Sequence, residues 1–213
     1  MRKLSYFIGT TIDGFIADPD GGYDFFFAHL TEDYAPTLFS AYPETIPTPG
    51  RTAAGIAEAP NKRFDTVLQG RGTYEHGLAV GLTSPYAHLR QIVFSRTLTP
   101  SPDPAVEVTA EDPLSVVRRL KQEDGLGIWL CGGADLAGQL LPEIDELIIK
   151  QYPVVAGSGT PLFRTGFEPR AFTLTDSRVF ERGNVILTYA RTAPSASTGT
   201  PTDAGSPDGP DAC

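Results

Sequence analysis

The sequence is poor in the residues that several classes of protein depend on. Two cysteines and three histidines among 213 residues are too few for a disulfide framework, and no His/Cys cluster has zinc spacing. With 17 basic against 26 acidic residues, the chain lacks the basic face of a nucleic-acid binder. It also lacks a long apolar run, so we expect no signal peptide, no membrane span and a cytoplasmic protein.

The residues that are present suit one globular domain followed by a tail. Hydrophobic residues make up 40% of the chain, and residues 1–191 are enough for one sizeable core. Residues 192–213 contain no Lys or Arg but several prolines and glycines, so we expect a disordered tail. Residues 43–62 are also rich in proline. They predict a long surface loop, which would be either a lid over a site or a plain insertion.

Strand and helix patterns alternate along the rest of the chain. Short runs of β-forming residues predict strands at 4–11, 15–17, 66–69, 92–94, 106–109, 128–131 and 146–152, and a closing hairpin from 172–180 and 184–189. Between them, Asp112 and Pro113 have the positions of an N-cap and a first helical residue. We therefore expect an α/β fold with a mostly parallel central sheet, helices on both faces and an antiparallel C-terminal edge.

A glycine pair, Gly132-Gly133, joins the most apolar strand to a helix. Without side chains, this corner lets a ligand approach the backbone, and the N–H groups of the following helix favour an anion. The pair belongs neither to a G-x-G-x-x-G motif nor to a Walker A loop. Taken alone, it is equally consistent with a tight turn that binds nothing.

Two further strand ends carry similar residues. The strand at 66–69 runs into Gly70-Arg71-Gly72-Thr73, and the strand at 92–94 runs into Ser95-Arg96. In an open α/β sheet, ligands bind outside the carboxyl ends of the strands. Either arginine alone would fit an ordinary surface position. Together, the guanidinium groups and the hydroxyls of Thr73 and Ser95 indicate an anionic, phosphate-bearing cofactor.

These motifs resemble those of a known family. Residues 11–17, 64–75, 93–96 and 130–136 are similar to the dihydrofolate-reductase-like superfamily, and within it to the reductase domain of the riboflavin-biosynthesis deaminase/reductase proteins and their stand-alone relatives. The similarity extends over about residues 3–190. It implies a three-layer dihydrofolate-reductase-like fold, NADPH as cofactor and a homodimer.

The resemblance also implies which residues bind NADPH. They are Thr11, Ile16, Gly70, Arg71, Thr73, Ser95, Arg96, Cys131, Gly132, Gly133, Ala134, Asp135 and Leu136. The Gly132-Gly133 bond would be a cis peptide beside the nicotinamide and pyrophosphate. Arg71 and Thr73 would contact phosphates. Ser95 and Arg96 would lie near the 2′-phosphate, which favours NADPH over NADH.

The function that the resemblance implies is hydride transfer from NADPH to a small heterocyclic or carbonyl/imine substrate. The reaction would resemble that of 5-amino-6-(5-phosphoribosylamino)uracil reductase or of dihydrofolate reductase. Asp13 and Asp24 are the candidates for supplying or orienting a proton, although they equally fit a turn residue and a helix-start residue. The alternative is a non-catalytic NADP(H)-binding module or sensor.

Overall fold

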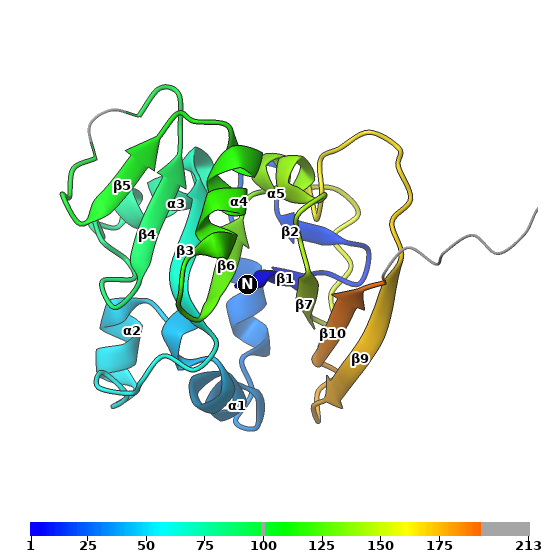
Figure 1. Cartoon of the computed structure of the whole chain (residues 1–213). Coiled ribbons are helices and arrows are strands. Elements are labelled where there is room, and N and C mark those ends of the chain that lie inside the picture. The colour runs from blue at the N-terminus through cyan, green and yellow to red at the C-terminus, as the bar shows by residue number, and fades with distance from the viewer. Residues whose placement is uncertain (99–100, 193–213) are drawn as a thin grey trace, which may run out of the picture.

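The computed structural model describes residues 1–98 and 101–192 and contains a central sheet of eight strands. In spatial order they are β5 (Val106–Thr109), β4 (Arg90–Phe94), β3 (Phe64–Gly70), β6 (Gly127–Gly132), β1 (Leu4–Thr10), β7 (Glu146–Gln151), β10 (Val185–Arg191) and β9 (Phe172–Val179). Neighbours from β5 to β7 are parallel, whereas β10 is antiparallel to both β7 and β9. Figure 1 shows the hairpin of β9 and β10 at the opposite edge from β5. The predicted α/β class and antiparallel edge are confirmed.

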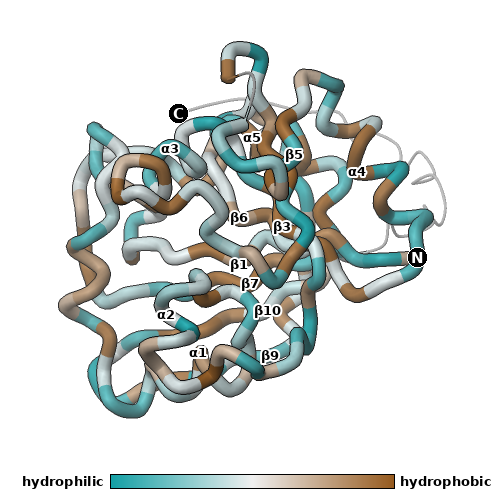
Figure 2. The backbone as a smooth tube through the Cα atoms, turned by 90° about the vertical axis from the view of Figure 1, so that its left-hand side faces the viewer, coloured by the Kyte–Doolittle hydropathy of each residue, from teal (hydrophilic) through white to brown (hydrophobic). Residues whose placement is uncertain are grey.

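The central strands are buried on both faces because their side chains point alternately to two apolar layers. On one face, Leu4 and Tyr6 of β1 pack with residues of α4 (Pro113–Gln122) and α5 (Ala134–Leu140). On the other face, Phe7 packs with residues of η1 (Asp24–His29) and α1 (Tyr34–Ala41). In Figure 2 the hydrophobic stretches run along β6, β1 and β7 in the middle of the molecule. This is the three-layer arrangement that the resemblance implies.

Two helices begin where the sequence places polar or small residues. α4 begins at Pro113, and the Asp112 carboxylate caps it by accepting a bond from the Ser115 N–H at 2.9 Å, as predicted. α3 (Arg71–Ala79) follows β3 without a connecting loop. Its Tyr74 side chain is fully buried against Val93. The carboxyl end of β3 therefore leads directly into the first turn of a helix.

The predicted surface loop at 43–62 is corrected by the structure. This segment contains η2 (Pro43–Thr45) and α2 (Thr48–Ala53), and its Glu44 and Arg51 side chains are buried. The Arg51 guanidinium donates to the carbonyls of Pro43 and Ala59, and so closes the segment on itself. Proline content suggested a loop, but buried charged groups that bond to backbone atoms give the segment a fixed fold.

A small second sheet lies beside the carboxyl end of β1. It pairs β2 (Phe15–Ala17) with β8 (Thr160–Pro161). No helix in the described ranges is both long and apolar enough to cross a membrane, and the same residues form no group of three or more potential metal ligands. Of the predicted tail, only Thr192 is described. Its N–H donates to the Ala171 carbonyl at 3.1 Å, and residues 193–213 lie outside the described part.

Candidate functional site

A cavity of about 1370 Å³ lies along the carboxyl ends of β4, β3, β6 and β1. Twelve of the thirteen predicted cofactor residues line it: Ile16, Gly70, Arg71, Thr73, Ser95, Arg96, Cys131, Gly132, Gly133, Ala134, Asp135 and Leu136. The three strand ends that the sequence singled out therefore border one space. The volume is larger than that of most pockets for a single small molecule, and it can hold a cofactor and a substrate side by side.

The glycine corner opens into this cavity. The Gly132-Gly133 peptide is cis, as the resemblance implies. Gly132 has a φ of +139°, which only glycine adopts readily. Gly133 has a φ of −96°, and a Cβ built on it would meet only the Thr73 Oγ1, at 3.5 Å. Neither backbone conformation nor packing requires glycine at 133, so the missing side chain serves to leave the cavity wall open.

Positive charge lies at the start of α3 and after β4. The N-cap residue Gly70 offers no side chain to the first turn of α3, whose N–H groups are oriented as in an anion site. Arg71 is half exposed, donates to the Thr97 hydroxyl at 3.0 Å and lies 3.6 Å from the Glu75 carboxylate. Arg96 is exposed and forms no ion pair with any described residue. Both guanidinium groups can reach a phosphate group at this end.

Two predicted hydroxyl ligands have bonds of their own. The Ser95 Oγ accepts from the Thr97 and Leu98 N–H groups, which leaves its hydroxyl hydrogen for a ligand. Thr11 does not line the cavity. Its hydroxyl donates to Asp13 at 2.6 Å and accepts from the Phe15 N–H at 2.9 Å, so Thr11 shapes the turn between β1 and β2.

Neither predicted proton donor lines the cavity. Asp24 is exposed at the first position of η1. The Asp13 carboxylate accepts bonds from Thr11 and from the N–H groups of Ala156 and Gly157. These bonds, the one from Thr11 foremost, lower the pKa of Asp13 to about 2. Asp13 is thus ionised at neutral pH and ties the β1–β2 turn to the loop before β8.

Aromatic rings form another part of the cavity wall. Phe26 and Tyr152 lie with ring centroids 4.5 Å apart, and Tyr86 meets Trp129 edge-on at 4.9 Å. A Cβ on Gly9 would come within 3.1 Å of the Tyr152 ring, so glycine there lets that ring lie against β1. The combination of apolar walls and few polar groups that binds small planar ligands is present here.

Lys150 is a cavity residue that sequence reasoning missed. It extends from β7, and its Nζ lies 4.3 Å from the centroid of the Phe7 ring. Burial lowers the pKa of Lys150 to about 8, against the opposing effect of the nearby Cys131 thiol. Such an ammonium can bind an electron-rich atom and can exchange a proton near neutral pH. In the sequence, Lys150 is part of an ordinary strand pattern, which gives no indication that its side chain lines a cavity.

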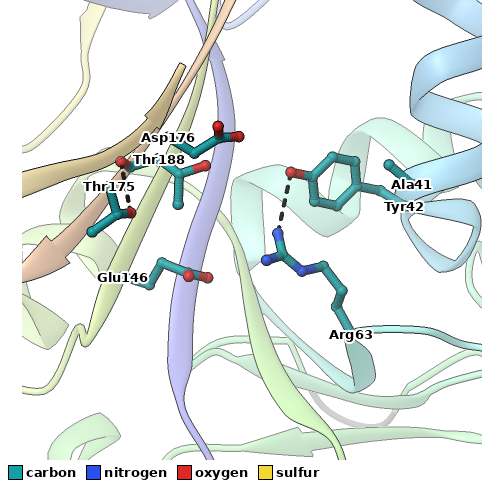
Figure 3. Close-up of a pocket in the computed structure, with 7 residues that line it drawn as sticks. All are labelled: Ala41, Tyr42, Arg63, Glu146, Thr175, Asp176 and Thr188. Atoms are coloured by element: carbon teal, nitrogen blue, oxygen red, sulfur yellow. Dashed lines mark hydrogen bonds between the residues drawn. The ribbon is translucent and has the colours of Figure 1, made fainter. Parts of the chain in front are cut away.

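A smaller depression of about 350 Å³ offers a different surface. Figure 3 shows Arg63 and Tyr42 facing Glu146 and Asp176 across it. The Arg63 guanidinium already donates to the Tyr42 hydroxyl at 3.1 Å and lies over that ring. With its cation engaged and two carboxylates on the opposite side, this depression does not suit an anionic cofactor.

The sequence matches the RibD C-terminal domain family over residues 2–187. It is 34% identical over 192 residues to the Bacillus subtilis (strain 168) protein YwjB, covering 89% of this chain and 98% of that protein. It is also 33% identical over 102 residues to YyaP of the same organism, where the match covers 47% of this chain and 54% of YyaP.

Solved structures show the same fold at low sequence identity. A Shewanella sp. PV-4 protein named for riboflavin biosynthesis matches with a TM-score of 0.64 and 24% identity, over 91% of this chain and all of that one. The diaminohydroxyphosphoribosylaminopyrimidine deaminase/5-amino-6-(5-phosphoribosylamino)uracil reductase of Thermotoga maritima matches at 0.59 and 16%, over 90% of this chain and 57% of that one. An Enterococcus faecalis dihydrofolate reductase complexed with NADP(H) matches at 0.58 and 16%, over 90% and 97%. By its sequence match and its dihydrofolate-reductase-like fold, the chain belongs to the RibD C-terminal domain family.

Proposed function

We propose that this protein is an NADPH-dependent reductase that transfers hydride to a small heterocyclic or carbonyl/imine substrate. Its reaction would resemble that of 5-amino-6-(5-phosphoribosylamino)uracil reductase or of dihydrofolate reductase. The observation that carries the proposal is the open glycine corner, where Gly133 leaves space that no part of the described chain fills. The names of two structural neighbours, a uracil reductase and a dihydrofolate reductase complexed with NADP(H), support the same chemistry.

The residues around the corner fit a dinucleotide phosphate. Arg71 and the first turn of α3 would hold the pyrophosphate, beside the bare backbone of Gly132 and Gly133. Arg96, without an ion-pair partner among the described residues, would bind the 2′-phosphate. When bound, the cofactor would supply the hydride. The chain's part is to hold it and to fix the substrate against it.

The aromatic wall would orient the substrate and exclude water. Phe26, Tyr86, Trp129 and Tyr152 are buried or partly buried, and all of them line the cavity. A planar ring placed among them would be shielded from solvent, which favours a hydride acceptor held close to its donor. The Asp13 bonds to Ala156 and Gly157 would keep the β1–β2 turn, and with it Ile16, in place at the cavity edge.

Calorimetric titration with NADPH and NADH tests the cofactor assignment. We expect NADPH to bind more tightly than NADH, because only NADPH carries the phosphate that Arg96 would hold. Hydrogen bonds to charged groups contribute about 1.5–3 kcal/mol, so Arg96→Ala should weaken NADPH binding about 10- to 100-fold and leave NADH binding unchanged. Equal binding of both nucleotides by the unmodified protein would contradict this placement of the 2′-phosphate.

The alternative is a non-catalytic NADP(H)-binding module or sensor. It is favoured by one observation, namely that neither Asp13 nor Asp24 lines the cavity. Loss of NADPH absorbance with pyrimidine, pterin or flavin-like compounds distinguishes the two functions. Turnover of any of them supports the reductase, whereas tight NADPH binding without turnover across such a panel favours the sensor.

A further inference from the structure

Lys150 is a cation without an anionic partner at the aromatic part of the cavity. Within residues 1–98 and 101–192, no carboxylate comes within 4.0 Å of its Nζ. Three acidic residues line the cavity, but they lie elsewhere. Glu111 and Asp112 follow β5, which is five strands away from β7 in the sheet, and Asp135 on α5 pairs with Arg164 at 2.8 Å.

The surroundings of Lys150 are aromatic. Lys150 pairs in register with Gly9 of β1, where the Tyr152 ring lies against the position of the absent side chain. Its Nζ lies over the Phe7 ring, next to Cys131. A ring face attracts a cation, but it provides no hydrogen-bond acceptor. Within the described residues, the Lys150 ammonium, which lines the cavity, thus has a ring face beside it and no carboxylate partner.

We propose that the Lys150 ammonium binds an electron-rich oxygen or nitrogen of a planar substrate, so that the site selects neutral carbonyl or imine compounds and anionic rings and rejects cationic amidine-like rings. This inference rests on the proposed function, because it names the class of molecule that the reductase would take. A carboxylate in this position would select the opposite class, since it would pair with a protonated ring. Lys150 is then a specificity-determining residue of the substrate end.

The thiol and the phenols around Lys150 keep their protons near pH 8. Burial raises the pKa of Cys131 to about 11, and it also raises the pKa values of Tyr23, Tyr86 and Tyr152. The imidazoles nearby are His29, which packs against the Tyr152 ring, and His76, which packs against the Tyr23 ring. A change in anion binding around pH 8 that depends on residue 150 would therefore report on the lysine.

Benzoate and benzamidinium provide a matched pair of probes. Both are planar, of similar size, and keep opposite charges at pH 7. We would titrate each by calorimetry into the full chain, with and without saturating NADP⁺, using the unmodified protein, Lys150→Met, Lys150→Arg and Lys3→Met. Lys3 is an exposed lysine outside the cavity, so it controls for a general loss of charge. Circular dichroism would verify that every variant is folded.

We expect the unmodified protein and Lys3→Met to bind benzoate at least tenfold more tightly than benzamidinium. Lys150→Met should lose at least tenfold in benzoate affinity and lose the discrimination, whereas Lys150→Arg should keep both. Benzoate affinity should fall as the pH rises through about 8 in the unmodified protein and persist to higher pH in Lys150→Arg. Equal binding of the two probes, or an unchanged benzoate affinity in folded Lys150→Met, would overturn the inference.

Failure of the proposed function and failure of the Lys150 inference give different titration results. If NADPH does not bind, the titrations without nucleotide still measure the benzoate preference and its dependence on residue 150. If NADPH binds but benzoate shows no preference, the reductase assignment stands and the role of Lys150 is refuted. Where NADPH binds, its affinity should be the same in Lys150→Met as in the unmodified protein, because Lys150 lies away from Arg71 and Arg96.

Discussion

Glu44 is a buried carboxylate that accepts three consecutive backbone N–H groups. Its Oε1 accepts from Arg63 at 2.7 Å and from Phe64 at 2.9 Å, and its Oε2 accepts from Lys62 at 3.3 Å. Glu44 thereby joins the segment before α2 to the start of β3. The neighbouring residues Thr45 and Ile46 line the cavity, so the same bonds hold part of the cavity wall.

Glu44→Ala should lower the free energy of unfolding by about 3 kcal/mol. Each bond to a charged acceptor contributes about 1.5–3 kcal/mol, and the two short bonds to Arg63 and Phe64 carry most of the effect. After truncation, water can reach the partly buried Arg63 N–H. The summed loss for the two bonds should therefore lie at the lower end of the range that these values give. In Glu44→Gln, the amide oxygen can keep both short bonds and only the long bond to Lys62 is lost, so we expect about 1 kcal/mol.

Urea unfolding followed by circular dichroism measures both values. Glu58→Ala is the matched control, because Glu58 is exposed in the same segment and should change stability by less than about 0.5 kcal/mol. The comparison requires equal m-values among the variants. Two results would refute the view that the Glu44 hydrogen bonds hold this segment. One is a loss of unfolding free energy below about 1 kcal/mol in Glu44→Ala, and the other is an alanine variant that is no less stable than the glutamine variant.

Three further outcomes can be tested. The pKa of Asp13 is lowered to about 2 in the folded protein. The ionised carboxylate therefore stabilises the fold above its ordinary pKa, near pH 4, and this stabilisation is lost as the pH falls to about 2. The difference in unfolding free energy between the unmodified protein and Asp13→Asn should disappear over that interval. In a Cys213→Ser background at pH 7.5, Cys131 should react with iodoacetamide about a hundredfold more slowly than in the urea-unfolded chain, because burial raises the pKa of its thiol to about 11. By the family resemblance we expect a homodimer, for which light scattering should give about twice the chain mass of 22.8 kDa, and a mass of one chain at micromolar concentration would contradict it.

The sequence was sufficient for the sheet and for the grouping of three strand ends at one cavity. Period-two and apolar runs predict strands at 106–109 and 128–131 because buried parallel strands consist of such residues. Small and basic residues directly after β3, β4 and β6 predict a shared site because parallel strands end at one edge of the sheet. The cavity lining bears out the proximity of these residues, while the binding of NADPH by them stays a prediction.

Other features depend on contacts between distant parts of the chain and were not predictable in this way. The fold of 43–62 results from Glu44 bonds to residues nearly twenty positions away. Asp13 had the same sequence signature as a turn residue and as a catalytic acid, and only its bonds to Ala156 and Gly157 reveal where its carboxylate lies. Lys150 becomes distinctive only because β7 places it beside Gly9 and Phe7, without a described carboxylate nearby.

The most direct test of the account is the NADPH dissociation constant of Gly133→Ala. The added methyl group meets only the Thr73 Oγ1 within 4 Å, at an ordinary contact distance of 3.5 Å, so it should leave the fold intact while projecting into the cofactor space. The matched control is Gly166→Ala. Gly166 does not line the cavity, and a Cβ built on it meets no atom within 4 Å. Overpacking of this kind costs about 1–3 kcal/mol. The account predicts NADPH binding at least tenfold weaker in folded Gly133→Ala and unchanged in Gly166→Ala, whereas equal affinity in both variants would contradict a cofactor site at the glycine corner.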